Sequence, residues 1–285
     1  MNRGPPPRKG YNRTSCYLGP VEEVIHEFEL ICRAQHDNAP KTIKDQGRAL
    51  SKLLRILGAP GIFTKEDIMN GLASMSKADR VHATKAIRKL LKAIGREDMV
   101  KGLKIPSYGA RKWHLPSDEE LRLFYEALDR EDAKLAFRLL AETGLRKNEI
   151  LKARVGDIDW EHMAIIPNRA TATKRSGIGF FTPDTAEMLR EAVKGKDPDD
   201  LIFPYRSDIW LRKAFKRAEK ATGVKVCPQM LRVRFADKMG EADIPDRYVD
   251  ILQGRAPTSV LARHYTPSGL KKLRSKWSKA SLKVA

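Results

Sequence analysis

Two stretches with helical periodicity, divided by one segment that lacks it, determine how this 285-residue chain can fold. The dividing segment, residues 99–115, lies within the stretch MVKGLKIPSYGARKWHLPS, which runs from Met99 to Ser117. This stretch holds two prolines, two glycines and five basic residues, His114 included, but no acidic residue. Proline and glycine interrupt regular structure, and domain boundaries fall in such stretches. We therefore interpret the segment as a linker between two domains, and the chain is long enough for two ordinary cores.

The first domain, residues 20–98, is expected to be a compact helical bundle. Its first helix is indicated by apolar residues on one helical face, namely Val21, Val24, Ile25, Phe28, Ile31 and Cys32. Leucines at helical spacing predict a second helix over residues 50–57, and apolar residues at 87–94 line a fourth. Between them, Thr64 and Asp67 have the spacing of an N-cap signal and predict the start of a short third helix.

Two basic stretches accompany this bundle. Residues 1–19 contain Pro5, Pro6 and Pro7, four lysines or arginines and no acid, which predicts a flexible basic arm. The outward face of the fourth helix carries Lys85, Arg88, Lys89 and Lys92. Each stretch is interpreted either as a solvated surface or as a contact to the phosphates of a nucleic acid.

The second domain, residues 116–285, is predicted to be mainly α with a small antiparallel β-sheet, an α+β fold. Ser117 and Glu120 have the spacing of a capping box, and residues 131–153 look helical with a break at Thr143 and Gly144. The short apolar stretches MAIIP, GIGFFTP and LIFP predict the strands, with residues 168–176 as the turn between the first two. Helices are expected again at 184–194 and 207–221, and almost continuously from Gln229 onward.

Charge is the most informative property of the composition. The 55 lysines and arginines exceed the 36 acidic residues and give a formal net charge of +19. Such an excess favours a polyanionic partner, and nucleic acid is the leading candidate. The cysteines are Cys16, Cys32 and Cys227, which form no CxxC pair, so we expect neither a disulfide framework nor a metal site. Without an apolar signal core or a membrane-length run, we expect a cytoplasmic protein.

Four local patterns in the second domain are candidates for a site. Arg146 in ETGLRKNEIL opens a helix, where its charge opposes the helix dipole. Lys174 and Arg175 lie in the predicted strand turn ATATKRSGIGFF. Gln229 and Arg232 in PQMLRVRFADKMG lie at i and i+3 on one helix face. The last pattern, LQGRAPTSVLARHYTP, places Arg255 after a glycine and Tyr265 ten residues later. Each pattern alone is typical of ordinary structure.

In this order, the patterns TGLRKNEIL, the turn lysine, QMLRVRFA, LQGR and HY resemble the tyrosine recombinases, particularly integrases of archaeal viruses and plasmids. The resemblance covers the whole second domain. It also implies that the helical first domain corresponds to the DNA-clamping, core-binding domain of that family.

The resemblance implies a site-specific DNA recombinase or integrase that needs neither metal nor ATP and has no cofactor. Tyr265 would attack a phosphodiester and form a 3′-phosphotyrosyl bond. Arg146 and Arg232 match the two family arginines that meet the charge of the transition state. Lys174 matches the lysine that protonates the leaving 5′-oxygen, and Arg175 takes that role if the turn register differs by one residue.

Two positions depart from the common family pattern. Gln229 stands where histidine is frequent, and an amide can donate a hydrogen bond but cannot carry a proton. Arg255 replaces a histidine or tryptophan and adds a fixed positive charge. His264 adjoins Tyr265, but neighbouring residues of a helix point about 100° apart, so we interpret it as structural or DNA-facing.

The resemblance also implies a homotetramer on double-stranded DNA, with a monomer possible in solution. Two alternatives remain open: a type IB topoisomerase, which shares the nucleophile and the arginines, and a DNA-binding module without catalysis. The basic C-terminal stretch GLKKLRSKWSKASLKVA is interpreted as a solvated tail, a helix that docks on a neighbouring subunit, or a DNA contact. Tyr248 and Trp210 lie on apolar helical faces and are expected in the core.

Overall fold

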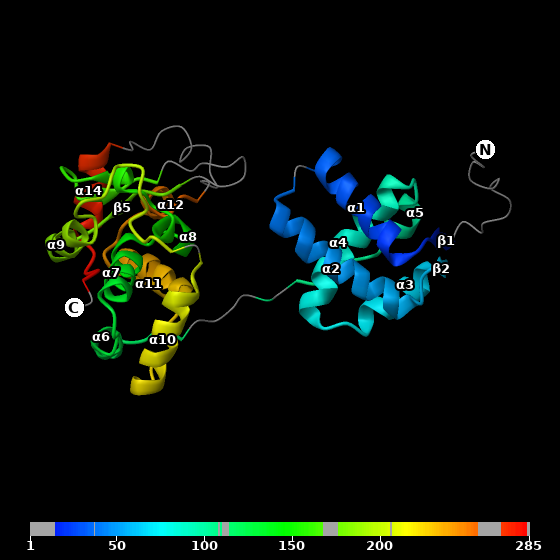
Figure 1. Ribbon diagram of the computed structural model, residues 1–285, viewed down its shortest axis with the longest axis horizontal. Helices are drawn as coiled ribbons and strands as arrows, with labels where there is room; N and C mark the ends of the chain where they lie inside the picture. Colours follow the sequence, from blue (N-terminus) through cyan, green and yellow to red (C-terminus); the bar gives the residue numbers. More distant parts are fainter. Residues whose placement is uncertain are drawn as a thin grey trace. The chain divides into compact units, whose positions relative to one another are not determined.

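The chain divides into two compact units, Met1–Arg111 and Lys112–Ala285, which are described separately (Figure 1). The computed structural model describes residues 15–36, 38–107, 109, 114–167, 176–205, 207–255 and 269–283. These residues are mainly helical and include two small antiparallel sheets, so the predicted fold class is confirmed.

The first unit contains a bundle of helices in which α2 packs against α1, α3 and α4. Its helices are α1 (Val21–Gln35), α2 (Pro40–Leu57), α3 (Lys65–Ala73), α4 (Lys77–Ala93) and α5 (Glu97–Val100). The buried faces carry the apolar residues from which the sequence predicted helices, including Phe28 of α1 and Leu53 of α2, both fully buried. Burial of these stripes is what holds short helices together in water.

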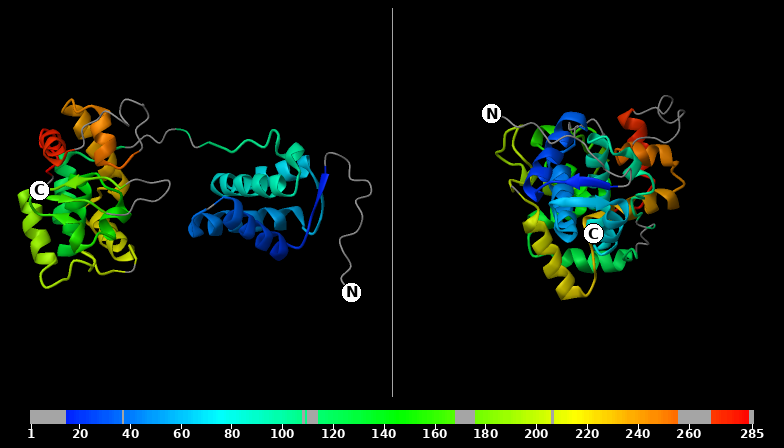
Figure 2. Two further views of the ribbon diagram at one scale, coloured as in Figure 1. Left: turned by 90° about the horizontal axis from the view of Figure 1, so that it is seen from above. Right: turned by 90° about the vertical axis from the view of Figure 1, so that its right-hand side faces the viewer.

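A two-stranded antiparallel sheet closes one end of this bundle, as Figure 2 shows. Strand β1 (Ser15–Leu18) pairs with β2 (Gly61–Thr64), so that Cys16 lies opposite Phe63. The predicted flexible arm of residues 1–19 is therefore wrong for residues 15–18. The basic and proline-rich composition that suggested an arm ends at Arg13, and Cys16 and Leu18 are buried against the bundle.

The predicted N-cap at Thr64 and the predicted capping box at Ser117 are both present, and Thr64 also forms a capping box. The hydroxyl of Thr64 accepts a hydrogen bond from the N–H of Asp67, and the Asp67 carboxylate accepts one from the N–H of Thr64. Ser117 and Glu120 make the same reciprocal pair at the start of α6. These contacts satisfy backbone donors that the first helical turn leaves unpaired.

The second unit is built around α7, whose residues from Leu135 to Thr143 are all buried. This helix packs against α8, α9, α10 and α11. The helices of the unit are α6 (Asp118–Glu126), α7 (Glu131–Thr143), α8 (Lys147–Leu151), α9 (Pro183–Ala192), α10 (Ile209–Thr222), α11 (Pro228–Glu241), α12 (Asp246–Leu252) and α14 (Leu270–Trp277), with a short 3₁₀ turn at Val155–Asp157. The predicted break between α7 and α8 is confirmed at Gly144, which has a left-handed backbone with φ +63°.

The small sheet of this unit has the order β3-β4-β5 and is antiparallel throughout. Strands β4 (Ala164–Ile165) and β5 (Gly179–Phe180) fall in the predicted stretches MAIIP and GIGFFTP. The third strand was wrongly placed in LIFP: β3 is Ile158–Asp159, and in LIFP Leu201 makes an isolated bridge to Arg154. Ile202 and Phe203 of LIFP pack into the core, while the LIFP backbone runs outside the sheet.

The described part of the C-terminal stretch packs on its own unit. Leu273, Trp277 and Leu282 are buried in a cluster that also contains Phe180 and Phe235. The interpretation of this stretch as a solvated tail is therefore wrong for residues 270–283. None of the helices described here has the length and apolar character needed to cross a membrane.

Gly144 gives the first test of this architecture. A Cβ at this position would lie 2.5 Å from Cγ of Phe235, and the backbone conformation already disfavours an L-side chain. We expect Gly144→Ala to lower the free energy of unfolding by about 2–4 kcal/mol in urea denaturation. The matched control is Gly223→Ala, where φ is +74° but no atom lies within 4 Å, and the expected cost is about 1 kcal/mol. Equal losses for both variants would contradict the predicted clash.

Candidate active site

Arg146 and Arg232 converge on one stretch of backbone, residues 253–255, which we call the arginine corner. Arg232 donates from Nη2 to the carbonyl of Gln253 at 2.8 Å, and Arg146 donates from Nη2 to the carbonyl of Gly254 at 3.2 Å. The two guanidinium groups come from α11 and from the N-terminus of α8, which lie far apart in the sequence. The structure therefore brings together two residues that the sequence analysis selected independently.

Arg232 is held rigidly in this position. It is only 5% exposed, and its Nη1 also donates to the carbonyl of Gly144 at 2.7 Å. In return, the side-chain amide of Gln253 donates to the carbonyl of Arg232 at 2.8 Å. Because Leu231 and Phe235 anchor the same helix in the core, the guanidinium cannot easily leave.

Arg146 is the N-cap residue of α8, and Glu149 fixes it there. The Glu149 carboxylate accepts one hydrogen bond from the backbone N–H of Arg146 at 2.7 Å and another from its Nη1 at 2.8 Å. The carboxylate also suits the positive end of the helix dipole, where Arg146 alone would be unfavourable. Glu149 thus makes an arginine tolerable at this helix start and orients its guanidinium.

Positive charge is concentrated around Arg232. Its pKa lies at about 10, because burial disfavours the charged form and the charges of Arg146 and Arg255 repel it, while Glu149 acts in the opposite direction. Entry of an anion into such a site would relieve the repulsion and favour the charged guanidinium. The electrostatics therefore suit a phosphate or another oxyanion.

The residues just before β5, Gly177 and Ile178, lie against the arginine corner and follow the predicted turn. The N–H of Ile178 donates to the carbonyl of Leu252 at 3.1 Å, just before the corner. A Cβ at Gly177 would lie 2.9 Å from the backbone nitrogen of Gly254, so only glycine permits this close approach. The stretch that carries Lys174 and Arg175 immediately precedes this contact in the chain.

The other described candidates lie at the surface. Gln229 is exposed in the first turn of α11, one turn before Arg232, and Arg255 is exposed at the end of the arginine corner. Lys174, Arg175, His264 and Tyr265 lie outside the described residues. Their assignments stay predictions.

Two residues of the site were missed by the sequence analysis. Glu149 follows Arg146 at capping-box spacing, and this signal could have identified it. Gln253 is fully buried and bonds to Arg232 across 21 residues, a contact for which the sequence holds no local signal.

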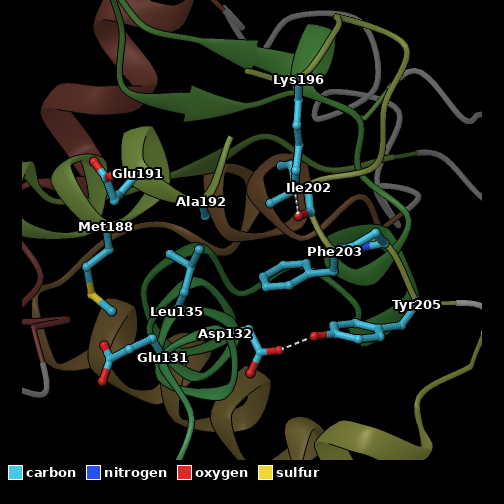
Figure 3. A pocket seen from close by; sticks show the side chains of 11 residues that line it. Glu131, Asp132, Leu135, Met188, Glu191, Ala192, Lys196, Ile202, Phe203 and Tyr205 are labelled. Atoms are coloured by element: carbon cyan, nitrogen blue, oxygen red, sulfur yellow. Dashed lines mark hydrogen bonds between the residues drawn. The ribbon is translucent and has the colours of Figure 1, made fainter. Parts of the chain in front are cut away.

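A separate cavity of about 500 Å³ lies in the second unit, away from the arginine corner (Figure 3). Its walls include Leu135, Met188 and Phe203, and at its rim the hydroxyl of Tyr205 donates to the carboxylate of Asp132 at 2.5 Å. None of the candidate site residues that the structure describes, Arg146, Gln229, Arg232 and Arg255, lines it. Among the described residues, no cluster of histidine, cysteine, aspartate or glutamate has the arrangement of a metal site.

Comparisons with known proteins agree with this geometry. Residues 115–270, more than half of the chain, match the model of the phage integrase family. A tyrosine recombinase XerA from Saccharolobus solfataricus is 36% identical over 132 residues, which span 46% of this chain and 45% of that protein. A tyrosine recombinase XerA from Pyrococcus horikoshii is 24% identical over 275 residues, covering 91% of this chain and 94% of the relative.

The fold has a solved counterpart. A lambda integrase dimer bound to a COC′ core site superimposes with a TM-score of 0.66 at 16% identity, covering 89% of this chain and 98% of that one. The architecture is thus that of a tyrosine recombinase, an enzyme class that breaks and rejoins DNA strands. This chain belongs to the phage integrase family.

Proposed function

We propose that this protein is a site-specific DNA recombinase that cuts and rejoins duplex DNA with Tyr265 as its nucleophile. One observation carries the proposal: Arg146 and Arg232 meet at the arginine corner, and Arg255 at its end begins the segment that leads to Tyr265. Phosphoryl transfer without a metal needs fixed cationic donors close to the nucleophile. Guanidinium groups next to the start of the segment that carries Tyr265 would supply them.

The proposed reaction exchanges one ester for another. The Tyr265 hydroxyl gives its proton to water as its oxygen attacks phosphorus, the bond to the 5′-oxygen breaks, and a 3′-phosphotyrosyl bond forms. Lys174 gives its proton to the departing 5′-oxygen, with Arg175 as the alternative donor. Attack by a 5′-hydroxyl reverses these steps and regenerates the tyrosine, so no ATP is consumed.

The described residues take complementary roles in this proposal. Arg146 and Arg232 stabilise charge on the non-bridging oxygens, since planar guanidinium groups can donate two parallel hydrogen bonds. Gln229 donates a hydrogen bond where many family members have histidine, and the exposed Arg255 adds a third positive charge.

The first unit is proposed to hold DNA through a basic stripe on α2. The stripe consists of exposed residues spaced three or four apart along one helix face: Lys41, Lys44, Arg48, Lys52 and Arg55. Of the run predicted on α4, Arg88 donates to the carbonyl of Leu103, and Lys89 donates to Gln46 at 3.1 Å. These contacts occupy half of the α4 run. In the α2 stripe, Lys52 donates to Asp79 at 2.7 Å, while the other four side chains are exposed, so the stripe is the better candidate for phosphate contacts.

Arg48 provides the test of this stripe. We expect Arg48→Ala to weaken DNA binding about 3- to 10-fold and to reduce the slope of log affinity against log salt by about 1. Fluorescence anisotropy at several salt concentrations measures both quantities. Arg33→Ala is the control, because Arg33 is also exposed but lies on α1, outside the stripe, where it pairs with Glu29 of the same helix. A similar loss for both variants would mean that the stripe is not a specific contact.

Strand exchange between two duplexes cuts four strands and so needs four active sites; we therefore propose that four copies assemble on DNA from monomers in solution. The proposed place of action is the cytoplasm, in contact with DNA.

The decisive experiment traps the covalent intermediate. The protein is incubated with nicked duplexes of random sequence, and covalent complexes are recovered in detergent, sequenced and digested for mass spectrometry. A phosphorylated peptide containing Tyr265 is expected, and a different modified residue would refute the assignment. Joint products between two linear duplexes distinguish recombination from relaxation of supercoils alone, which would indicate a topoisomerase.

A further inference from the structure

The C-terminal end of α7 carries a buried carboxylate, Glu142, that the proposed reaction does not use. Its side chain is 1% exposed and accepts hydrogen bonds from the N–H of Thr182 at 2.9 Å and from the hydroxyl of Thr185 at 2.8 Å. Arg138 lies one turn earlier, with its Nε 3.5 Å from the carboxylate. Burial raises the pKa of Glu142, and these partners act against that rise.

The backbone carbonyl of Glu142 accepts a hydrogen bond from α14, the C-terminal helix. Nε1 of Trp277 donates to it at 2.8 Å, which satisfies a carbonyl at the end of α7 that has no helical partner. The indole is 7% exposed and lies 6.0 Å from the ring of Phe180, measured between ring centroids. This single hydrogen bond therefore lies inside a packed apolar cluster and cannot be replaced easily by water.

Three segments meet at Glu142, and each leads to a residue proposed for the chemistry. The end of α7 continues within four residues to Arg146. Thr182 follows β5, the strand that comes after the turn with Lys174. Trp277 belongs to α14, the helix that follows the segment with Tyr265. A shift of the backbone at Glu142 would therefore move the end of α7, the residues after β5 and α14 relative to one another.

Further contacts fix the same end of the chain. Lys283 pairs with Asp184 at 2.6 Å, and Nη1 of Arg234 donates to the carbonyl of Leu282 at 3.5 Å. On the other side of the nucleophile segment, the N–H of Arg255 donates to the carbonyl of Asp250 at 2.8 Å. The described chain on either side of the nucleophile segment is thus packed on the second unit.

We propose that Trp277 is a positioning residue for Tyr265, acting through its hydrogen bond to the Glu142 carbonyl. The inference rests on the proposed function, since it assumes that Tyr265 is the nucleophile. Docking of α14 sets where the nucleophile segment ends, and the hydrogen bond sets the register of α14 against the turn that carries Arg146. Attack on phosphorus is sensitive to such placement, and a misplacement of about 1 Å can cost about 100-fold in rate.

The test compares Trp277→Phe with Trp160→Phe. Phenylalanine keeps an aromatic ring against Phe180 but removes the N–H donor. Trp160 is 36% exposed and stacks with Arg190, so its replacement makes the same chemical change away from the junction. The substrate is the nicked duplex recovered with the wild-type protein. Adduct formation under single-turnover conditions, DNA affinity and thermal unfolding are measured, with kinetics well below the unfolding temperature of every variant.

We expect Trp277→Phe to slow adduct formation about 10- to 100-fold while DNA affinity changes by less than about twofold. Trp160→Phe is expected to match the wild type in both. An unchanged rate for Trp277→Phe would overturn the proposal, as would equal losses of rate and affinity, which indicate general structural damage. If Trp277→Phe does not fold, Lys283→Ala replaces it: this removes the outer contact of the same anchor, and a rate equal to wild type overturns the proposal. Absence of any wild-type adduct refutes the proposed function itself.

Discussion

Replacing Tyr265 with phenylalanine is expected to abolish the covalent protein–DNA adduct while DNA affinity stays within about twofold of the wild type. The substitution removes the one oxygen that can attack phosphorus and preserves the ring. Loss of a nucleophile leaves only the catalysis from bound positive charge, so the cleavage rate should fall by roughly 1,000-fold or more. Denaturing gel electrophoresis of protein bound to the nicked duplex measures the adduct, and anisotropy measures the affinity.

Tyr248→Phe is the matched control for this prediction. Burial raises the pKa of the Tyr248 hydroxyl, but Arg247, Lys272 and Lys276 outweigh that effect and bring the pKa below its usual value. Tyr248 is only 4% exposed and is not placed to attack DNA, so this variant tests whether loss of another tyrosine hydroxyl also removes the adduct. We expect Tyr248→Phe to keep most of the adduct formation. If this variant loses the adduct and Tyr265→Phe retains it, the nucleophile has been assigned to the wrong tyrosine.

The second large effect is expected for Arg232→Lys. Lysine keeps the positive charge, but one ammonium group cannot replace the planar fork that reaches the carbonyls of Gly144 and Gln253. One buried carbonyl is left without a partner, which should lower the free energy of unfolding by about 1–3 kcal/mol. Adduct formation should fall about 100- to 1,000-fold, because a fixed donor to the transition state is lost.

Arg234→Lys separates the two effects. Arg234 lies on the same helix, its side chain is 3% exposed, and it bonds to Asp118 at 2.6 Å, away from the arginine corner. We expect a similar loss of stability, measured by urea denaturation, but an adduct rate within about threefold of the wild type. If both arginine variants lose the same activity, the effect of Arg232→Lys reflects folding rather than chemistry.

Much of the helical architecture could be predicted because its signals are local. The stripe from Val21 to Cys32 identified α1, and the capping boxes at Thr64 and Ser117 identified the starts of α3 and α6. The strands were harder, since each spans two to four residues and such short stretches carry little periodicity. Strand β1 was assigned to the arm, and β3 was missed in favour of LIFP.

For the candidate site, too, residues with a local sequence signal could be predicted and residues without one could not. Arg146, Gln229, Arg232 and Arg255 stood out from motif order, and the structure brings Arg146 and Arg232 to the arginine corner, with Arg255 at its end. Glu149 carried a recognisable local signal that was not used. The contributions of Gln253, Glu142 and Trp277 could not be predicted, because each depends on a hydrogen bond to a backbone group distant in sequence.

The sequence by itself determined much of the helical structure and the division into two units, and it singled out the side chains that we propose to contact phosphate, because these properties depend on spacing and residue type. The tertiary structure alone decided that the two arginines share one backbone corner and that the C-terminal helix docks on its own unit. Those outcomes depend on how backbone carbonyls at the ends of α7 and α12 find donors from other helices. Such pairings are selected by burial in the folded chain and leave no pattern along the sequence.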